Sequence, residues 1–383
     1  MQQRYYSLDV FRGATVALMI LVNNPGSWSH VYHALSHAEW NGFSGADAVF
    51  PFFLFAVGNA LSFVMLKLQQ ASTTAVYIKI LKRTFLIFLI GYLINWMPFV
   101  KWDNNTLVPK DLSKLRIMGV LQRIALCYGI AALLIYHIKP RVTFLLSCLI
   151  LIGYWAICFL GGDQNNPYSM QGFLGTYVDK FILGENLMYK GEGSTFDPEG
   201  LLSTIPAIVQ VIFGYLVGLY IQQKGKTFEM LANLLVIGCV LVGCGLIWDS
   251  AFPINKKMWT SAYVVYSTGL AVLVLSILIY AIEFKNKRGM WSKFFDVFGK
   301  NALFIFMLSG IIPRIQALIR IKDGFATDGK IHYTTPFGWF YKYVCAPIST
   351  IPEIGSLLYA IITLLVFWTI VYWMDKKKIY IKV

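Results

Sequence analysis

Long apolar segments alternate with short polar ones from one end of the chain to the other. The apolar segments hold about 20 residues each, the length that an α-helix needs to cross a hydrocarbon core of ~30 Å. Ten segments fit this description, so the chain is predicted to be an all-α polytopic membrane protein with about ten transmembrane helices in one bundle, a single domain over residues 1–383. The predicted spans are residues 8–24, 47–68, 77–98, 117–137, 142–160, 200–222, 230–248, 260–282, 294–313 and 354–374.

The overall composition agrees with a membrane protein and excludes an ordinary soluble domain. The chain is 57% hydrophobic and only 14% charged, and its mean hydropathy is +0.61. A typical soluble domain has about 25% charged residues. A lipid bilayer is therefore the expected surrounding.

Basic residues indicate how the predicted bundle is oriented. Lysine and arginine are in excess at one set of helix ends, whereas the loops at the other ends carry a nearly balanced charge. Cytoplasmic loops are typically the basic ones, so both termini are predicted to lie in the cytoplasm and the protein in the inner membrane. The net charge of +14 is then mostly an inner-leaflet feature, and nucleic acid is not predicted as a partner because no basic run has a domain to carry it.

Two long loops are predicted on the outer side, over residues 161–199 and 314–353. The first contains VDKFILGENLMY, a pattern that favours a short amphipathic helix on the membrane surface. The second contains FGWFYKYVCAP, whose aromatic side chains suit the membrane–water interface.

A polar cluster lies between the first two predicted spans, in SHAEWNGFSGADAVFPFF (Ser36 to Phe53). Ser44 and Asp47 have the spacing of a capping box, so Asp47 is expected at least to cap the second span. The neighbours of His37, Glu39 to Asn41, offer the orienting acceptor and the water-limiting wall that a general base needs. An interfacial histidine without a catalytic role is the alternative.

Histidines at positions 30, 33 and 37 also raise the question of a metal site, because these spacings would place them on one helical face. The segment is not convincingly helical, and no HExxH pattern accompanies it. Ordinary surface histidines at 30 and 33 explain the spacing equally well, and no metal is predicted.

Charged residues inside the predicted spans form a second group of candidates. Asp9 and Arg12 are three positions apart and Arg116 and Arg123 are seven apart, so each pair shares one helix face, and Lys300 is followed by Asn301. Such residues are costly in hydrocarbon and usually face a polar cavity, although interfacial anchoring and contacts between helices are simpler explanations for each one alone. Together they predict a polar path whose cations suit an anionic ligand such as a phosphate-bearing cofactor.

Several motifs, taken in order, resemble the heparan-α-glucosaminide N-acetyltransferase family, including its bacterial NagX-like members. They are SLDVFRG, LMILVNNPG, HAEWNGFSGADAVFPFFLFAVG, KLRIMGVLQRIALCYG, DPEGLLSTIPAIVQVIFGYLVG and GKNALFIF. The resemblance implies a multi-pass enzyme that uses cytosolic acetyl-CoA to acetylate an amino sugar on the far side of the membrane. No metal is implied.

The resemblance also implies roles for individual residues. The family's active-site histidine falls on His37, its asparagine at the end of the first helix on Asn23, and its aspartate before V-F-P on Asp47. An imidazole ordinarily titrates near pH ~6.5 and can take a proton from an amine, and Asn23 is a candidate oxyanion donor. The predicted CoA-binding residues are Arg116, Arg123, Lys300, Asn301 and Arg12.

Some questions stay open at this stage. The segment NNPGSWSHVYHALSH replaces a shorter Gly-rich turn of the animal enzymes, so the acceptor is expected only to be an amino sugar or a glycosaminoglycan fragment. His37 is either a general base or a transient acetyl carrier, and the oligomeric state is open, with a homodimer as one candidate. A transporter of a small anion or sugar, and an O-acyltransferase of surface polysaccharide, are the rival functions.

Overall fold

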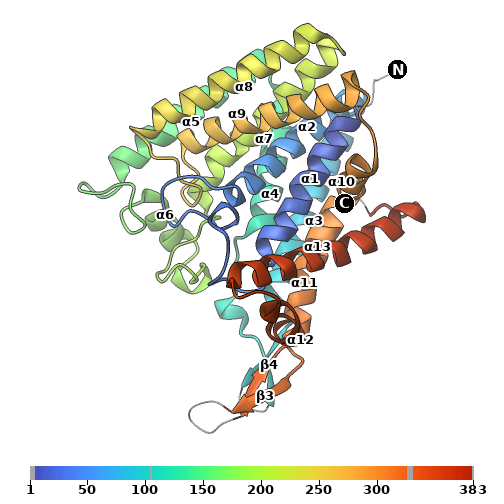
Figure 1. The fold of residues 1–383 in the computed structure, drawn as a ribbon. Coiled ribbons are helices and arrows are strands. Elements are labelled where there is room, and N and C mark those ends of the chain that lie inside the picture. The colour runs from blue at the N-terminus through green and yellow to red at the C-terminus, as the bar shows by residue number, and fades with distance from the viewer. Residues whose placement is uncertain (1–4, 104–105, 326–330, 382–383) are drawn as a thin grey trace.

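Long apolar helices form the body of the molecule and pack into one bundle (Figure 1). The structure, a computed structural model, describes residues 5–103, 106–325 and 331–381. The long helices are α1 (Tyr6–Asn23), α2 (Val49–Leu68), α3 (Thr73–Trp96), α4 (Val120–His137), α5 (Pro140–Gly161), α7 (Leu201–Lys224), α8 (Phe228–Asp249), α9 (Ser261–Ile279), α10 (Met290–Lys300), α11 (Ala302–Gln316) and α13 (Pro352–Lys376). The shorter elements are helices α6 (Leu174–Ile182) and α12 (Pro336–Phe340) and strands β1 (Val100–Asp103), β2 (Thr106–Pro109), β3 (Ile321–Phe325) and β4 (Ile331–Thr334).

The helices confirm the predicted all-α polytopic membrane protein. Within the described residues, 8 helices are long and apolar enough to cross a membrane, or 9 when α10 and α11 are taken as one broken span. Helix α3 has 24 residues but is not among them, because each of its 18-residue windows contains Lys79, Lys82 and Arg83. Every predicted span overlaps one of the long helices.

One predicted span differs from the structure in a way that matters for the site. Residues 294–313 do not form one helix, because α10 and α11 meet at an angle of 79°. Asn301 lies at the junction, where its Nδ2 donates to the Ile379 carbonyl at 3.0 Å and its Oδ1 accepts from the Ile381 N–H at 2.9 Å. The break therefore involves a distant segment of the chain, which no local pattern reveals.

Glycines allow helices α2 and α7 to pack with their backbones in contact. A Cβ atom at Gly58 would lie 1.9 Å from the Val211 carbonyl oxygen, and one at Gly214 would lie 2.1 Å from the Phe55 carbonyl oxygen. Small residues have this role in helix pairs within membranes, where close packing replaces the hydrophobic effect. The contact fixes the position of α2, and the candidate residue Asp47 lies in the 3-10 turn directly before this helix.

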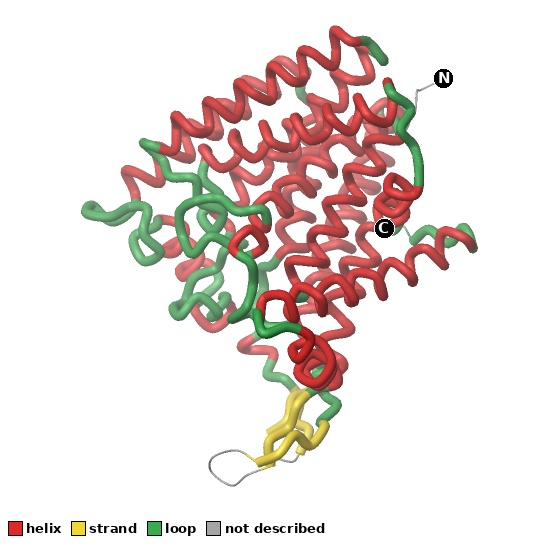
Figure 2. Tube along the Cα trace, viewed as in Figure 1, coloured by secondary structure: helices red, strands yellow, loops and turns green. Residues whose placement is uncertain are grey.

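The two ends of the bundle are different. Both chain termini lie on one side (right in Figure 1), whereas the long loops gather on the opposite side (left and bottom in Figure 2). We call these the terminal end and the loop end. The predicted amphipathic helix is present only in part, because α6 starts earlier and ends at Ile182, within the VDKFILGENLMY segment. Its two faces differ as expected, since Phe181 is 91% exposed and Asp179 only 2% exposed.

Two β-hairpins at the loop end were not expected from the sequence. Strand β1 pairs with β2 and strand β3 with β4, both antiparallel. The guanidinium of Arg320 stacks on the Trp102 ring at 4.0 Å from its centroid, and the Trp102 indole N–H donates to the Leu318 carbonyl at 3.1 Å. These contacts join segments that are more than 200 positions apart in the sequence.

Candidate active site

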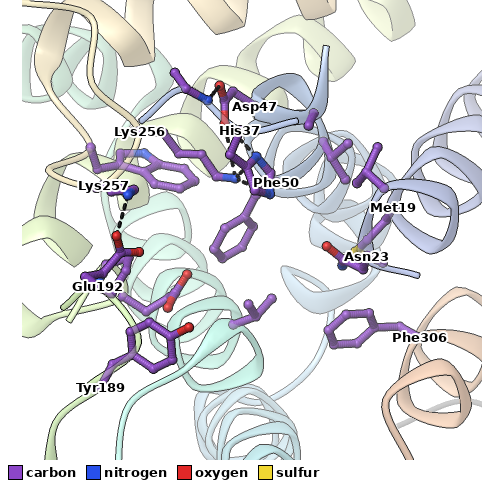
Figure 3. Close-up of a pocket in the computed structure, with 18 of the residues that line it drawn as sticks. Met19, Asn23, His37, Asp47, Phe50, Tyr189, Glu192, Lys256, Lys257 and Phe306 are labelled. Atoms are coloured by element: carbon purple, nitrogen blue, oxygen red, sulfur yellow. Dashed lines mark hydrogen bonds and ion pairs between the residues drawn. The ribbon is translucent and has the colours of Figure 1, made fainter. Parts of the chain in front are cut away.

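A cavity of about 350 Å³ lies at the loop end, where α1 ends and α2 begins. We call it the His37 cavity; Figure 3 shows it with His37 near its centre. Its lining includes four of the residues that the sequence singled out, together with carboxylates and lysines from distant segments. These residues are Asn23, His37, Asp47, Arg116, Tyr189, Glu192, Glu199, Lys256, Lys257, Trp259 and Phe306, with apolar residues of α1, α2 and α4.

Asp47 organises the loop that precedes α2. Its buried carboxylate, 1% exposed, accepts hydrogen bonds from the Ala38 and Ser44 backbone N–H groups, both at 3.1 Å. The second of these is one half of the predicted capping box. The other half is missing among the described residues, because neither the 3-10 turn Ala46–Ala48 nor α2 has a side-chain hydrogen bond at its N-cap. The Ser44 hydroxyl donates instead to the Ser36 carbonyl and to Asp47. The same carboxylate lies 2.8 Å from Nδ1 of His37, so it both closes the loop and holds the imidazole.

This contact determines how His37 can act. A carboxylate can only accept, so Nδ1 of His37 is assigned the proton and Nε2 is left with the lone pair. The His37 side chain is 37% exposed, which gives a reactant access to it. The orienting acceptor is Asp47 and not the neighbouring Glu39, which is exposed and is not among the residues that line the cavity.

Lys256, which sequence reasoning missed, is the third member of this group. Its Nζ lies 3.0 Å from Nδ1 and 3.3 Å from Nε2 of His37 and 3.4 Å from Oδ1 of Asp47. Burial lowers the pKa of the Lys256 ammonium below the ordinary lysine value, and the carboxylates of Asp47 and Glu199 oppose that shift. Lys256 therefore places a mostly buried cation against the imidazole.

The segment that carries Lys256 is joined to the His37 loop by a pair of asparagines. The Asn255 Nδ2 donates to Oδ1 of Asn41 at 3.1 Å, although the two residues are 214 positions apart. The Asn255 N–H donates to the Thr260 hydroxyl at the start of α9. The only local signal for Lys256 is its place in a polar loop before a span, which is too common to identify a site.

Asn23, the last residue of α1, contributes an amide to the cavity. In Figure 3 it enters from the side of Met19 and Phe306, whereas His37, Asp47 and Lys256 lie across the cavity from it. The sequence predicted that Asn23, His37 and Asp47 share one site, and the structure brings them to one cavity.

Arg116 and Arg123 both lie at the loop end. Arg116 lines the His37 cavity, pairs with Asp197 and Glu199, and stacks on the Tyr189 ring at 4.5 Å. Burial lowers the pKa of Arg116, but the carboxylates of Glu199 and Asp197 more than offset it, so the net shift is upward.

Arg123 is fully buried beneath the same cavity wall. Its guanidinium donates to the Gly200 carbonyl at 3.3 Å and to the Ser203 hydroxyl, and it lies 5.0 Å from the centroid of the Trp259 ring. In the part of the chain that the structure describes, its Nε and Nη1 have no hydrogen-bond partner. Both arginines thus hold the segment that leads into α7.

The other predicted cations lie at the terminal end. A cavity of about 920 Å³, here called the Lys300 cavity, is lined by Arg12, Arg288 and Lys300. Arg12 pairs with Asp9 at 3.1 Å, as its spacing predicted, and Lys300 pairs with Asp296 at 2.7 Å and Asp375 at 3.0 Å. Asn301 is buried behind this cavity and binds the C-terminal segment.

The remaining histidines of the loop lie away from this group. His30 lines a small cavity against α13, and His33 is exposed in a short 3-10 turn. Among the described residues, no group of three or more His, Cys, Asp or Glu side chains is arranged to hold a metal ion.

Fold and site together define a multi-pass membrane protein that has a His–Asp pair at one mouth of its bundle and a cation-lined cavity at the other. The family model described as heparan-alpha-glucosaminide N-acetyltransferase, catalytic, matches residues 4–233, so the chain belongs to this family. The match includes His37, Asp47 and both loop-end arginines but ends before Lys256 and Lys300.

Two curated relatives extend this similarity. The chain is 29% identical to heparan-alpha-glucosaminide N-acetyltransferase of Homo sapiens, over 76% of this chain and 50% of the human protein. It is likewise 29% identical to the Mus musculus protein of the same name, with the same shares covered. The chain thus spans about half the length of the curated relatives it matches.

Proposed function

We propose that this protein is a membrane N-acetyltransferase that moves the acetyl group of acetyl-CoA to the amine of a glucosamine-type sugar. The observation that carries the proposal is the 2.8 Å contact between Asp47 and Nδ1 of His37, which leaves Nε2 as a base in a cavity at a bundle mouth. Membership of the N-acetyltransferase family supports the same reaction class.

In the proposed reaction, the neutral amine nitrogen attacks the carbonyl carbon of the thioester. The C–N bond forms, the C–S bond breaks, and the proton of the nitrogen passes through Nε2 of His37 to the departing thiolate sulfur. Asp47 keeps the imidazole in the required tautomer. The Asn23 amide donates to the oxygen that becomes negative during attack.

Lys256 has one consequence for this reaction. Its ammonium lies 3.3 Å from Nε2 of His37, where the acceptor amine would bind, so the acceptor has to displace it. A route through acetyl-His37 would use the same nitrogen, and it stays an alternative within this proposal.

The donor is proposed to enter from the terminal end. Arg12, Arg288 and Lys300 line the Lys300 cavity, and Arg12 and Asn23 are 11 positions apart on α1, about 16 Å at 1.5 Å per residue. A donor whose anionic head binds at Arg12 and whose acyl group reaches Asn23 must be long and narrow, which suits CoA. The His37 and Lys300 cavities share none of the described lining residues. The pantetheine arm of CoA would therefore have to displace the side chains that lie between them.

Sidedness follows from the basic residues in the same proposal. Lysines gather at the terminal end, which supports a cytoplasmic location for that end under the positive-inside rule; they are Lys79, Lys82, Lys285 and the lysines after Asp375. The His37 cavity then faces the outside of the inner membrane. Acetyl-CoA would be used on one side and the amino sugar acetylated on the other.

The test is acetyl-CoA-dependent CoA release by the purified protein with glucosamine and, separately, with glucose. CoA release with glucosamine but not with glucose supports N-acetyl transfer. Release with both sugars would point to an O-acyltransferase, and no release with either, combined with uptake of a labelled sugar or anion into vesicles, would point to a transporter.

A further inference from the structure

Another cavity, of about 610 Å³, opens beside the His37 cavity at the loop end. We call it the Trp40 cavity. Trp40 and Asn41 line it and follow His37 by only three and four positions, and Glu192 lines both cavities. A ligand whose reacting group lies at His37 therefore has a second compartment next to it. The remaining lining residues are Asn166, Tyr168, Ser169, Met170, Gln171, Gly193, Ser194 and Pro253.

The aromatic wall of this cavity is held firmly in place. The Trp40 indole N–H donates to the Tyr168 carbonyl at 2.8 Å, and the Trp40 ring meets the Phe196 ring edge-on at 5.5 Å. The Tyr168 hydroxyl accepts from the Trp155 indole at 3.1 Å, which fixes the Tyr168 ring as well. Fixed aromatic side chains offer contact area at little cost in conformational entropy.

Amide groups supply directional hydrogen bonds around that wall. The Asn41 Oδ1 is occupied by Asn255, so the N–H donors of Asn41 are what it offers to a ligand. Asn166 and Gln171 lie on the exposed rim and provide both donors and acceptors. An aromatic face with neutral amides and hydroxyls suits a ring that has an apolar C–H face and several hydroxyl groups, as a sugar does.

The charge of the lining restricts which sugar would bind. None of the described residues that line the Trp40 cavity is a lysine, arginine or histidine, and the carboxylate among them, Glu192, is paired with Lys257. A carboxylated or sulfated ring would meet Glu192 without a free cation to pair with, and removing such an anion from water without a partner is costly. The lining therefore favours an uncharged ring.

We propose that the Trp40 cavity is an acceptor subsite that binds an uncharged sugar ring linked to the glucosamine being acetylated. This inference rests on the proposed function. The preferred acceptor is then a glucosaminide with a neutral second residue, and not free glucosamine. The Glu192–Lys257 pair lies between the two compartments, where the glycosidic linkage would pass.

The test compares kcat/KM for three acceptors: glucosamine, glucosamine linked to glucose, and glucosamine linked to glucuronic acid. The kcat/KM of the glucose-linked acceptor is expected to exceed that of glucosamine by about tenfold or more, the size of a few added contacts. The kcat/KM of the glucuronic-acid-linked acceptor is expected to show no such gain. Gln171→Ala should lower the ratio of glucose-linked acceptor to glucosamine by about threefold, the loss of one hydrogen bond of ~0.5–1 kcal/mol. Because Gln171 is exposed, this variant avoids the folding risk of Trp40→Ala.

Gln70→Ala is the matched control, an exposed glutamine outside every described cavity lining, and should keep the wild-type ratio. If glucosamine is acetylated but the glucose-linked acceptor gives no gain, the subsite is wrong while the proposed function stands. Calorimetric binding of the N-acetylated disaccharide to wild type and Gln171→Ala gives a readout without turnover. Equal affinities would overturn the subsite whatever the activity.

Discussion

At the scale of single residues, Asp47 has two roles through one carboxylate. It accepts the N–H groups of Ala38 and Ser44, which shapes the loop, and it orients the His37 imidazole. The structural role alone would not require a histidine beside it. The loop structure and the proposed catalysis therefore depend on the same carboxylate. Loss of activity in an Asp47 variant would not separate the two roles, because a buried N–H group left without its acceptor costs about 1–3 kcal/mol by itself.

Asn23 allows a cleaner test of transition-state stabilisation. Asn23→Ala is expected to lower kcat by about 10²-fold or more, the usual loss when one oxyanion donor is removed. The KM for glucosamine should change much less, because the donor acts on charge that develops only during reaction. Steady-state kinetics measure both, and a variant that raises KM with kcat intact would show that Asn23 binds the acceptor instead.

Lys256 predicts a specific effect on acceptor binding. In Lys256→Met the acceptor amine no longer has to displace an ammonium that lies 3.3 Å from Nε2 of His37. The KM for glucosamine should therefore fall by about two- to fivefold, the equivalent of an ion-pair contact of ~0.5–1 kcal/mol. Lys257→Met, which removes a lysine paired with Glu192, should leave that KM in place; an identical fall in both variants would contradict the assignment.

The sequence predicted part of this site for a physical reason. His37 and Asp47 are 10 positions apart, so a local pattern of polar residues before an apolar span was enough to single them out. Lys256 is 219 positions from His37, and the contact depends on the packing of α9 against the first helices. No local periodicity carries that information.

At the scale of elements, α6 is positioned by a buried carboxyl. The Asp179 Oδ1 accepts the Leu201 N–H at 2.8 Å at the start of α7, and a Cβ at Gly200 would lie 1.8 Å from Oδ2. Burial raises the pKa of Asp179 from 3.8 to about 7, and the nearby Asp197 adds to the shift. The folded protein thus favours the protonated carboxyl.

The sign of the resulting pH effect follows from linkage. Because the folded state holds a proton that the unfolded state loses at lower pH, the free energy of unfolding should fall as pH rises from about 4 to about 7. Asp179→Asn keeps an acceptor for Leu201 without the ionisation. The decrease in Tm from pH 5 to pH 8 should therefore be smaller in this variant than in wild type, by roughly 2–4 °C.

Thermal unfolding of the detergent-solubilised protein at the two pH values measures this effect. Asp163→Asn, at an exposed aspartate of the same loop, is the control and should behave as wild type. An Asp179→Asn variant with the same pH dependence as wild type would show that this carboxyl is ionised on both sides of neutrality.

Elements differ in how well the sequence predicted them. Spans such as 47–68 and 230–248 were predicted because a continuous apolar run of that length has few alternatives. The hairpins β1–β2 and β3–β4 and the break at Asn301 depend on contacts between distant segments. Local composition therefore identified the helices but not the points where tertiary contacts end or bend them.

At the scale of the whole molecule, the predicted cations are divided between two ends of the bundle. Arg12 and Lys300 line the Lys300 cavity, whereas Arg116 and Arg123 lie at the loop end and bind the segment before α7. The sequence predicted that all four cations line one polar path, because the spacing of residues indicates which helix face they share but not how deep in the membrane they lie. As CoA ligands all four stay predictions, and the geometry favours the terminal-end pair.

Direct binding measurements separate the two ends. Arg12→Gln and Arg288→Gln should each weaken acetyl-CoA binding on the order of tenfold, and more at low salt, where phosphate contacts are least screened. Arg116→Gln should alter binding far less, although it leaves Asp197 and Glu199 without their partner. Calorimetric titration measures the affinities, and a larger loss in Arg116→Gln than in the other two would place the phosphates at the loop end.

If His37 is the base for acetyl transfer, its removal should stop the reaction without weakening acetyl-CoA binding. Transfer of labelled acetyl from acetyl-CoA to glucosamine is measured together with acetyl-CoA affinity, in wild type, in His37→Ala and in His33→Ala, which changes an exposed histidine of the same loop. His37→Ala is expected to bind acetyl-CoA as wild type does but to transfer less than about 1% as much acetyl, given the 10²–10⁴-fold contribution of a general base. His33→Ala is expected to remain active. Transfer by His37→Ala at the wild-type rate would show that His37 is not the base.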